Sequence, residues 1–172
     1  KKVVNYKTVM SDAASGFTSV TYPFPVIRMA DLYLMYAEAL NEKGEDYATV
    51  LPWIEMVRER SGLQGVKESW DQYVGNSKYA TQTGLRQIIM QERRIELAFE
   101  GHYFWDVRRW KTATTELTQP LTGWKVRYGE TDVDYYSENL VLVRDFTPKM
   151  YFWPIDIGEL RKDPNLVQNY GW

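Results

Sequence analysis

The stretch VIRMADLYLMYAEALNEKG, residues 26–44, decides the fold. It is rich in helix-forming residues, and at about 100° per residue its apolar side chains fall on two separate arcs of a helix. The two arcs consist of Ile27, Ala30, Leu34 and Ala37, and of Leu32, Tyr33, Tyr36 and Leu40. A helix that is apolar on two sides packs between neighbouring elements. The stretch therefore predicts a helix from Val26 to about Lys43 within a protein built mainly of helices.

A second helix follows and completes a helix–turn–helix unit. Gly44 is expected to end the first helix, and the second runs to about Arg60. The face that the second helix should bury consists of Leu51, Ile54 and Val57. Pro52 must lie in the first turn of this helix or kink it. The unit spans roughly the 34 residues of a tetratricopeptide repeat, and a single repeat cannot bury its own faces. Either its partners are missing from this chain or irregular helices replace them.

The rest of the chain alternates between loops and helices. The expected segments are an extended arm (1–25), a polar-aromatic loop (63–84), a long helix (85–110), a second loop (112–139) and a β-hairpin (140–146 with 149–155). Gly101 is a candidate interruption of the long helix. The fold class is therefore mainly α, with tetratricopeptide-like helix pairs, long loops and a small accessory β-hairpin, of the α-α superhelix class. We expect residues 1–172 to form a single domain.

Composition argues against several classes of function. The net charge is −2 and the signs are interspersed, so no basic stripe is available to bind nucleic acid. With no cysteine there is no disulfide, thiolate nucleophile or Cys-ligated zinc. No apolar run approaches the roughly 20 residues of a membrane span, and no signal-peptide pattern opens the chain. Because the chain lacks an initiator Met, we expect a processed or truncated product.

The charged stretch ERRIELAFEGHYFWDVRRW, residues 92–110, could hold an active site. On a helical wheel, Glu92 and Glu96 fall within one apolar arc. The apolar members of this arc are Leu85, Ile88, Ile89, Ile95 and Phe99. Two carboxylates at i,i+4 could act as a glycosidase pair or as half of a metal site. However, neighbours on one helix approach a bond from the same side, and the Glu-x-x-His motif of di-metal bundles is absent.

The alternative for these carboxylates is a structural brace. A buried unpaired carboxylate is costly, and a guanidinium is its usual partner. Arg58 lies on the apolar arc of the second helix, and Arg28 and Arg93 are nearby donors. We favour this interpretation, with a brace that consists of Glu92, Glu96, Arg58 and Arg93.

Other catalytic arrangements lack their signatures. His102 is the only histidine, and no nucleophile elbow accompanies it. The spacing of Asp106 and Arg109 indicates an ion pair on the surface of one helix. No P-loop, dinucleotide fingerprint, HExxH motif or EF-hand loop occurs. The sequence therefore predicts no catalytic residue, no metal and no cofactor.

Aromatic residues make up 15% of the chain, which is more than core filling usually demands. Seven of them lie in the two loops among polar residues, without helical or strand periodicity. Sugar rings bind to flat apolar faces that are flanked by hydrogen-bonding side chains, and both loops supply this mixture. The alternative is that these rings pin long loops to the body of the protein. The candidate ligand contacts are Trp70, Tyr73, Tyr79, Trp124, Tyr128, Tyr135 and Tyr136.

Four ordered blocks, covering about half the chain, resemble the C-terminal half of the SusD/RagB family of outer-membrane nutrient-binding lipoproteins of Bacteroidetes. The blocks are VIRMADLYLMYAEALNEKG, VRERSGL, RQIIMQERRIELAFEGHYFWDVRRW and YFWPIDIGELRKDPNLVQNYGW. This chain has Pro154-Ile155-Asp156 where the family usually has Pro-Ile-Pro, and Asn169-Tyr170-Gly171 where the family has Asn-Pro-Gly. Both departures affect turns near the C-terminus and leave the expected fold unchanged.

The resemblance implies a helical protein without enzymatic activity, the C-terminal part of a longer one. Such a protein is tethered to the outer membrane by an N-terminal lipid, is exposed at the cell surface, and hands glycans or peptides to a TonB-dependent (SusC-like) transporter. The family's ligand contacts vary between members, so the resemblance assigns no residue. Three functions remain open: capture of an oligosaccharide for uptake, a helical scaffold for a protein partner, and a glycan-cleaving enzyme that uses Glu92 or Glu96.

Overall fold

The computed structural model describes residues 9–10, 17–18, 23, 25–125 and 131–172. The chain divides into two compact units, residues 1–103 and 104–172. The single-domain organisation stays a prediction. Most of the expected extended arm lies outside the described residues. Two short antiparallel strands are described there, β1 (Val9–Met10) and β2 (Phe17–Thr18).

The helix–turn–helix unit forms as the sequence predicts, as α1 (Met29–Lys43) and α2 (Tyr47–Arg60). Gly44 ends α1 with a φ of 91°, in the left-handed region that favours glycine. Asp46 caps α2 by accepting a hydrogen bond from the amide of Thr49. Pro52 lies beyond the first turn of α2, which continues through it. Of the two alternatives for Pro52, a place in the first turn is therefore excluded.

The expected long helix is two helices, α4 (Gln82–Glu96) and α5 (His102–Arg109). Phe99 has a φ of 66° and Gly101 a φ of 86°, so the backbone leaves the right-handed helical region at both residues. The interruption expected at Gly101 is confirmed. Residues 63–84, expected as a loop, contain short helical pieces that sequence periodicity did not reveal. They are α3 (Val66–Ser69), a π-helix (Trp70–Val74) and a 3₁₀ turn (Lys78–Ala80).

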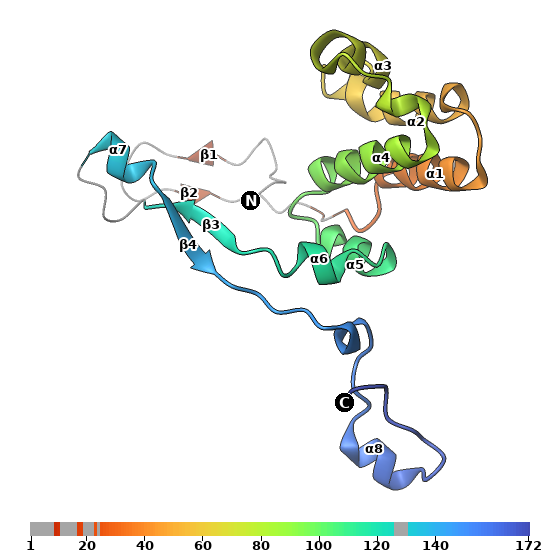
Figure 1. Cartoon of the computed structure of the whole chain (residues 1–172), viewed down its shortest axis with the longest axis vertical. Helices are drawn as coiled ribbons and strands as arrows, with labels where there is room; N and C mark the ends of the chain where they lie inside the picture. Colours follow the sequence, from red (N-terminus) through yellow and green to blue (C-terminus); the bar gives the residue numbers. More distant parts are fainter. Residues whose placement is uncertain (1–8, 11–16, 19–22, 24, 126–130) are drawn as a thin grey trace. The chain divides into compact units, whose positions relative to one another are not determined.

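The core of the first unit lies between α1, α2 and α4, which Figure 1 shows grouped together with α3. α1 and α4 run antiparallel, because Asn41 of α1 contacts Gln82 at the start of α4 and Asp31 contacts Arg93 near its end. The buried apolar residues of this core are Ala30, Leu34, Ala37, Val50, Leu51, Ile54, Val57, Val66, Tyr79, Leu85, Ile88 and Ile89. The chain is thus mainly helical, with a tetratricopeptide-like helix pair against which a third helix packs.

Only one apolar arc of α1 is buried within the helix, although Ile27 of that arc precedes Met29 and is 69% exposed. Leu34 and Ala37 are buried, whereas Leu32 and Tyr36 on the other arc remain exposed in the described part of the chain. Trp53 of α2 covers part of that arc, with ring centroids 6.0 Å from Tyr33 and 4.6 Å from Tyr36. The expectation of neighbours on both sides of α1 was therefore only half correct for the described residues.

Two members of the expected arc on α4 are not buried. Ile95 is 61% exposed and Phe99 is 96% exposed. Ile95 lies in the last turn of α4, about 200° around the helix from Arg93, which contacts α1 through Asp31, so α1 does not cover it. Phe99 follows the end of α4 and has left-handed backbone geometry, so the helical wheel does not apply to it.

The second unit contains short elements joined by loops. They are α6 (Ala113–Glu116), β3 (Leu121–Trp124), α7 (Asp132–Tyr135), β4 (Glu138–Leu142), a 3₁₀ turn (Pro148–Tyr151) and α8 (Ile157–Lys162). Asp156 caps α8 by accepting from the amide of Gly158 at 2.7 Å, so this departure from the family pattern has a capping role.

The predicted β-hairpin was wrong in its pairing. β4 pairs antiparallel with β3, which lies before it in the chain, with Trp124 opposite Glu138. The segment 149–155 is not a strand. Pro148 opens a 3₁₀ turn there, and the side chain of Gln168 binds both the amide and the carbonyl of Ile155, at 2.8 and 2.9 Å. These backbone groups are therefore not available for a sheet ladder.

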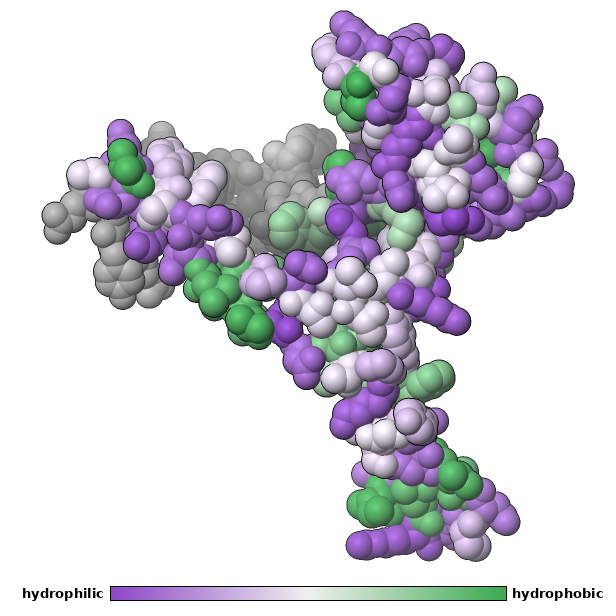
Figure 2. Space-filling model, viewed as in Figure 1, coloured by the Kyte–Doolittle hydropathy of each residue, from purple (hydrophilic) through white to green (hydrophobic). Residues whose placement is uncertain are grey.

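Apolar side chains are exposed on the second unit. Figure 2 shows them as green patches on β4 and around α8. They include Val141, Leu142, Val143, Ile157 and Val167. No helix in the described part of the chain is long and apolar enough to cross a membrane.

Candidate functional site

The acidic residues of α4 contact arginines from other elements. Arg58 of α2 donates to Glu92 through Nη1, to the Ser69 hydroxyl at 3.0 Å and to the Gln64 carbonyl at 2.7 Å. Both charged side chains are largely buried, at 15% and 13% exposure. A guanidinium that binds a carboxylate and two further acceptors is well satisfied, so Glu92 is held in one place.

Arg28 joins the other end of α4 to the start of α1. Its Nη1 donates to Glu96 at 2.5 Å, and its Nε and Nη2 form a fork on Glu100 at 2.7 and 2.8 Å. Arg60 also donates to Glu96, at 2.8 Å. The hydrogen bonds that Arg28 donates to Glu100 and Glu96 raise the pKa of Arg28 above its ordinary value. Glu96 therefore has two arginine partners, one from each neighbouring helix region.

Arg93 lies on the buried side of α4. Its Nη1 donates to Asp31 of α1 at 2.9 Å, and the side chains are only 3% and 9% exposed. These ion pairs have the geometry that a brace requires, although the role of Glu92, Glu96, Arg58 and Arg93 stays a prediction. Sequence reasoning did not single out Asp31, Arg60 or Glu100.

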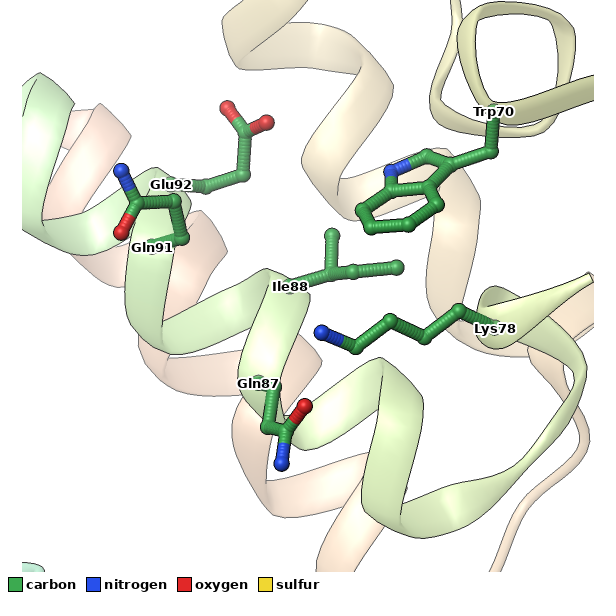
Figure 3. Close-up of a pocket in the computed structure, with 6 residues that line it drawn as sticks. All are labelled: Trp70, Lys78, Gln87, Ile88, Gln91 and Glu92. Carbon is green, nitrogen blue, oxygen red and sulfur yellow. The ribbon is translucent and has the colours of Figure 1, made fainter. Parts of the chain in front are cut away.

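A pocket of about 330 Å³ lies between the π-helix and α4. Figure 3 shows the six residues that line it: Trp70, Lys78, Gln87, Ile88, Gln91 and Glu92. Its volume is at the lower end of the roughly 300–1,000 Å³ typical of small-molecule sites. The pocket thus has room for a compact polar ligand.

Local backbone geometry positions the pocket residues. The amide of Gly75 donates to the carbonyl of Trp70 five residues earlier, which closes the π-turn that carries the indole. Gln87 and Gln91 are four residues apart on α4 and therefore lie on one face of it. In Figure 3 the indole lies beside Ile88, while Gln87 and Gln91 extend from α4 with their amides turned away from the indole.

The pocket offers a flat apolar face together with hydrogen-bonding groups. The Lys78 ammonium lies 5.3 Å from the centre of the Trp70 ring. Gln87 and Gln91 are exposed and carry both donors and acceptors. Glu92 reaches the pocket while bound to Arg58. This combination suits the stacking and hydrogen bonding of a sugar ring better than it suits proton transfer.

Of the six aromatic candidates that the structure describes, only Trp70 lines this pocket. Tyr73 is 72% exposed on the π-helix, where it could meet solvent or a ligand. Tyr79 is buried in the core, with its hydroxyl donating to Asp71 at 2.9 Å and its ring against Tyr47, which leaves little surface for a ligand.

Three candidates meet in the second unit. Trp124 and Tyr136 lie edge to face with ring centroids 5.2 Å apart, and Tyr135 lies 4.9 Å from Tyr136. Trp124 and Tyr136 are both about three-fifths exposed, so the cluster is a second place where rings could stack. Tyr128 lies outside the described residues.

The other sequence expectations concern catalysis and metals. The Asp106–Arg109 ion pair is confirmed, at 2.8 Å, but the Asp106 side chain is buried, so the expected place on the helix surface holds only for Arg109. In the described part of the chain, no group of three or more histidine, cysteine, aspartate or glutamate side chains could hold a metal ion. Sequence reasoning missed Lys78, Gln87 and Gln91. The i,i+4 spacing of the two glutamines could have signalled a shared face.

Comparison with known proteins decides the family. The model of the SusD family matches residues 1–172. This chain belongs to the SusD family. A relative named SusD-like protein P25, from Formosa agariphila, is 39% identical over 144 residues, which cover 84% of this chain and 23% of the relative. SusD-like protein P2 from the same organism is 37% identical over 98 residues, which cover 56% of this chain and 18% of the relative.

Solved structures agree with the family assignment. The crystal structure of a SusD-like protein from Bacteroides fragilis NCTC 9343 superposes with a TM-score of 0.68 and 28% identity, covering 90% of this chain and 28% of the other. The SusD-family chain thus spans about a quarter or less of the curated relatives it matches and slightly over a quarter of this solved chain.

Proposed function

We propose that this SusD-family protein captures an oligosaccharide and that the Trp70 pocket, formed by Trp70, Lys78, Gln87, Ile88, Gln91 and Glu92, contacts it. The observation that carries the proposal is an indole face in a cavity that two exposed glutamine side chains also line. Stacking on an aromatic ring buries the apolar face of a sugar, and side-chain amides bind its hydroxyl groups. A shallow site of this kind favours reversible binding.

We propose further that the protein acts at the surface of the outer membrane as a lipoprotein, and that it hands its ligand to a TonB-dependent transporter. Support comes from membership of the SusD family and from the sequence blocks that carry the resemblance. On this proposal the protein needs no catalytic group, metal or cofactor of its own, because the bound sugar leaves unchanged.

Titration calorimetry with a panel of plant, host and microbial oligosaccharides tests the binding site. Trp70→Ala should weaken binding of the best ligand at least tenfold, because stacking on an aromatic ring is lost. Trp105→Ala is a matched control, since Trp105 is exposed on α5 and does not line the Trp70 pocket. Trp124→Ala tests the cluster in the second unit. Unchanged affinity in Trp70→Ala with a loss in Trp124→Ala would move the site to that cluster.

The enzyme hypothesis is tested with the same samples. Glu92 and Glu96 are each bound to arginine, which supports a structural role over proton transfer. Incubated ligands should therefore contain no released sugars. If products do form and Glu92→Gln or Glu96→Gln abolishes them without lowering the melting temperature, the enzyme reading replaces capture.

A protein-binding scaffold is the second candidate function. It is favoured by the exposed apolar side chains Leu32, Met35, Tyr36 and Met56 on the described surfaces of α1 and α2. Large apolar patches on a folded surface often mark sites of association. Co-purification of a protein partner that is lost in Met35→Lys, with no affinity for any glycan, would support this function instead of capture.

A further inference from the structure

The Trp70 pocket contains a cation that has no acidic partner among the described residues. Lys78 makes no ion pair there, and its ammonium group is recorded only over the Trp70 ring. Two other lysines of the first unit differ in this respect. Lys67 binds Asp71 and Lys43 binds Glu45, at 2.7 and 2.6 Å. Lys78 is also half-buried, so its charge is less well solvated than a fully exposed one.

The one carboxylate that lines the pocket does not compensate Lys78. Glu92 is bound by Arg58, so these two charges cancel locally. Gln87 and Gln91 are neutral, and Ile88 and Trp70 are apolar. The uncompensated charge at the pocket is therefore positive, and it sits beside the ring on which a sugar would stack.

We infer that the ligand of the Trp70 pocket is an anionic sugar, whose carboxylate or sulfate binds the Lys78 ammonium while the ring contacts Trp70. This inference rests on the proposed function and specifies the ligand class at the same site. The glutamine amides donate to and accept from sugar hydroxyls, whereas the ammonium can only donate. A charged acceptor forms the stronger hydrogen bond with an ammonium, so the pocket discriminates against neutral sugars.

The test compares ligands that differ only in charge. Oligogalacturonate and its fully methyl-esterified form share one backbone, and titration of the protein with both measures the preference for a carboxylate. A sulfated galactan oligosaccharide and its desulfated counterpart measure the preference for a sulfate. In at least one of these two pairs, the anionic ligand should bind about tenfold more tightly than its neutral counterpart. Its affinity should fall as the salt concentration rises from about 0.01 to 0.15 M, because counterions screen the attraction.

Three variants assign the preference to Lys78. Lys78→Met keeps most of the side-chain length and removes the charge, so it should abolish the preference while affinity for the neutral member stays within about twofold. Lys78→Arg should retain the preference. Lys67→Met removes a nearby charge that is already bound to Asp71, and should leave both affinities unchanged.

The possible outcomes separate the inference from the function it rests on. Equal binding of charged and neutral ligands, with Trp70→Ala weakening both and Lys78→Met weakening neither, overturns the anionic specificity and leaves glycan capture standing. A preference that survives Lys78→Met, or disappears equally in Lys67→Met, also overturns it. If a glycan binds and Trp70→Ala leaves its affinity unchanged, the Trp70 pocket is not the site and both proposals fail.

Discussion

At the scale of single residues, buried charge makes the stability of the first unit sensitive to the loss of one partner. Asp31 and Arg93 lie almost entirely out of contact with solvent and bind each other at 2.9 Å. Each side chain alone would be an uncompensated charge in a region of low polarity. A pair of this kind stabilises the fold little compared with apolar residues of the same shape, but losing one partner is expensive.

Arg93→Met should therefore lower the free energy of unfolding by about 3–5 kcal/mol, because it strands the Asp31 carboxylate. Urea denaturation followed by circular dichroism measures the loss. The double variant Asp31→Leu with Arg93→Met should regain much of the stability. Lys162→Met, which removes an exposed ion pair with Glu159, should change it little. Equal losses in all three proteins would show that the burial of the pair is unimportant.

Glu55 gives stability an unusual pH dependence. Burial raises the pKa of its carboxyl above the ordinary 4.5, although the Val66 amide donates to it at 2.8 Å. A raised pKa means that the folded state binds the proton more tightly than the unfolded chain does. The contribution of Glu55 to the free energy of unfolding is therefore largest at low pH and falls as pH rises from about 4.5 through the raised pKa.

Glu55→Gln should remove this fall while keeping an acceptor for the Val66 amide. The difference in unfolding free energy between the variant and the parent should shift in favour of the variant between pH 4 and pH 7. Taking the difference cancels the opposite trend of Glu42, whose pKa Arg86 lowers. A constant difference across this range would contradict the assignment.

At the scale of elements, a break separates α4, whose carboxylates bind arginines, from α5, which is rich in aromatic residues. Two left-handed residues, Phe99 and Gly101, make the turn. Side chains with a β-carbon are strained in this conformation, and glycine is not. Phe99 is therefore in a strained backbone conformation. Gly101 adopts the second left-handed conformation without this strain.

Gly101→Ala should destabilise the protein by about 1–2 kcal/mol, because alanine is strained at a φ of 86°. Gly101→Asn should cost less, since asparagine adopts left-handed geometry more readily. Thermal unfolding of the two variants beside the parent measures both effects. If the alanine and asparagine variants lose the same stability, backbone strain at residue 101 does not explain the loss.

Strongly periodic elements were predictable from the sequence. The two apolar arcs and Gly44 predicted α1 to within three residues, since a 3.6-residue period and a glycine stop are local signals. The pairing of β3 with β4 was not predictable in this way. The segment 149–155 reads as a strand by composition, and only the contact of Gln168 with Ile155, distant in sequence, shows that its backbone groups are already taken.

At the scale of the whole molecule, burial is distributed unevenly between the two units. The first unit has a contiguous apolar core between three helices. In the described part of the second unit, the buried residues are Asp106, Val107, Ala113 and Phe146. Local opening is easiest where few apolar contacts must be broken.

Hydrogen exchange followed by mass spectrometry should therefore show the strongest protection in α1, α2 and α4. Amides of β4 and α8 should exchange faster by at least tenfold, because their side chains are exposed in the described chain. Equal protection in α4 and α8 would show that the second unit is stabilised by more than its own contacts. Measurement in the presence of the best glycan adds a check, since added protection should centre on residues 70–91.

The candidate site was predictable only in part. Trp70 was recognisable as an aromatic residue among polar ones, but so was Tyr79, which folding places in the core. Composition cannot separate the two, because burial depends on which side of the short helices each ring faces. Lys78 and Gln91 line the same pocket as Trp70 because α4 packs beside the π-helix, and this packing is not encoded in any local pattern.

The π-helix at residues 70–74 also bears on how the ligand preference could change over generations. A π-turn contains one residue more than an α-turn, so removing any one residue between Asp71 and Val74 would restore an ordinary helix. Each side chain beyond the deletion would then swing by about 100° around the axis. A single lost codon would thus change which side chains follow Trp70 around the helix, without any substitution in the pocket itself.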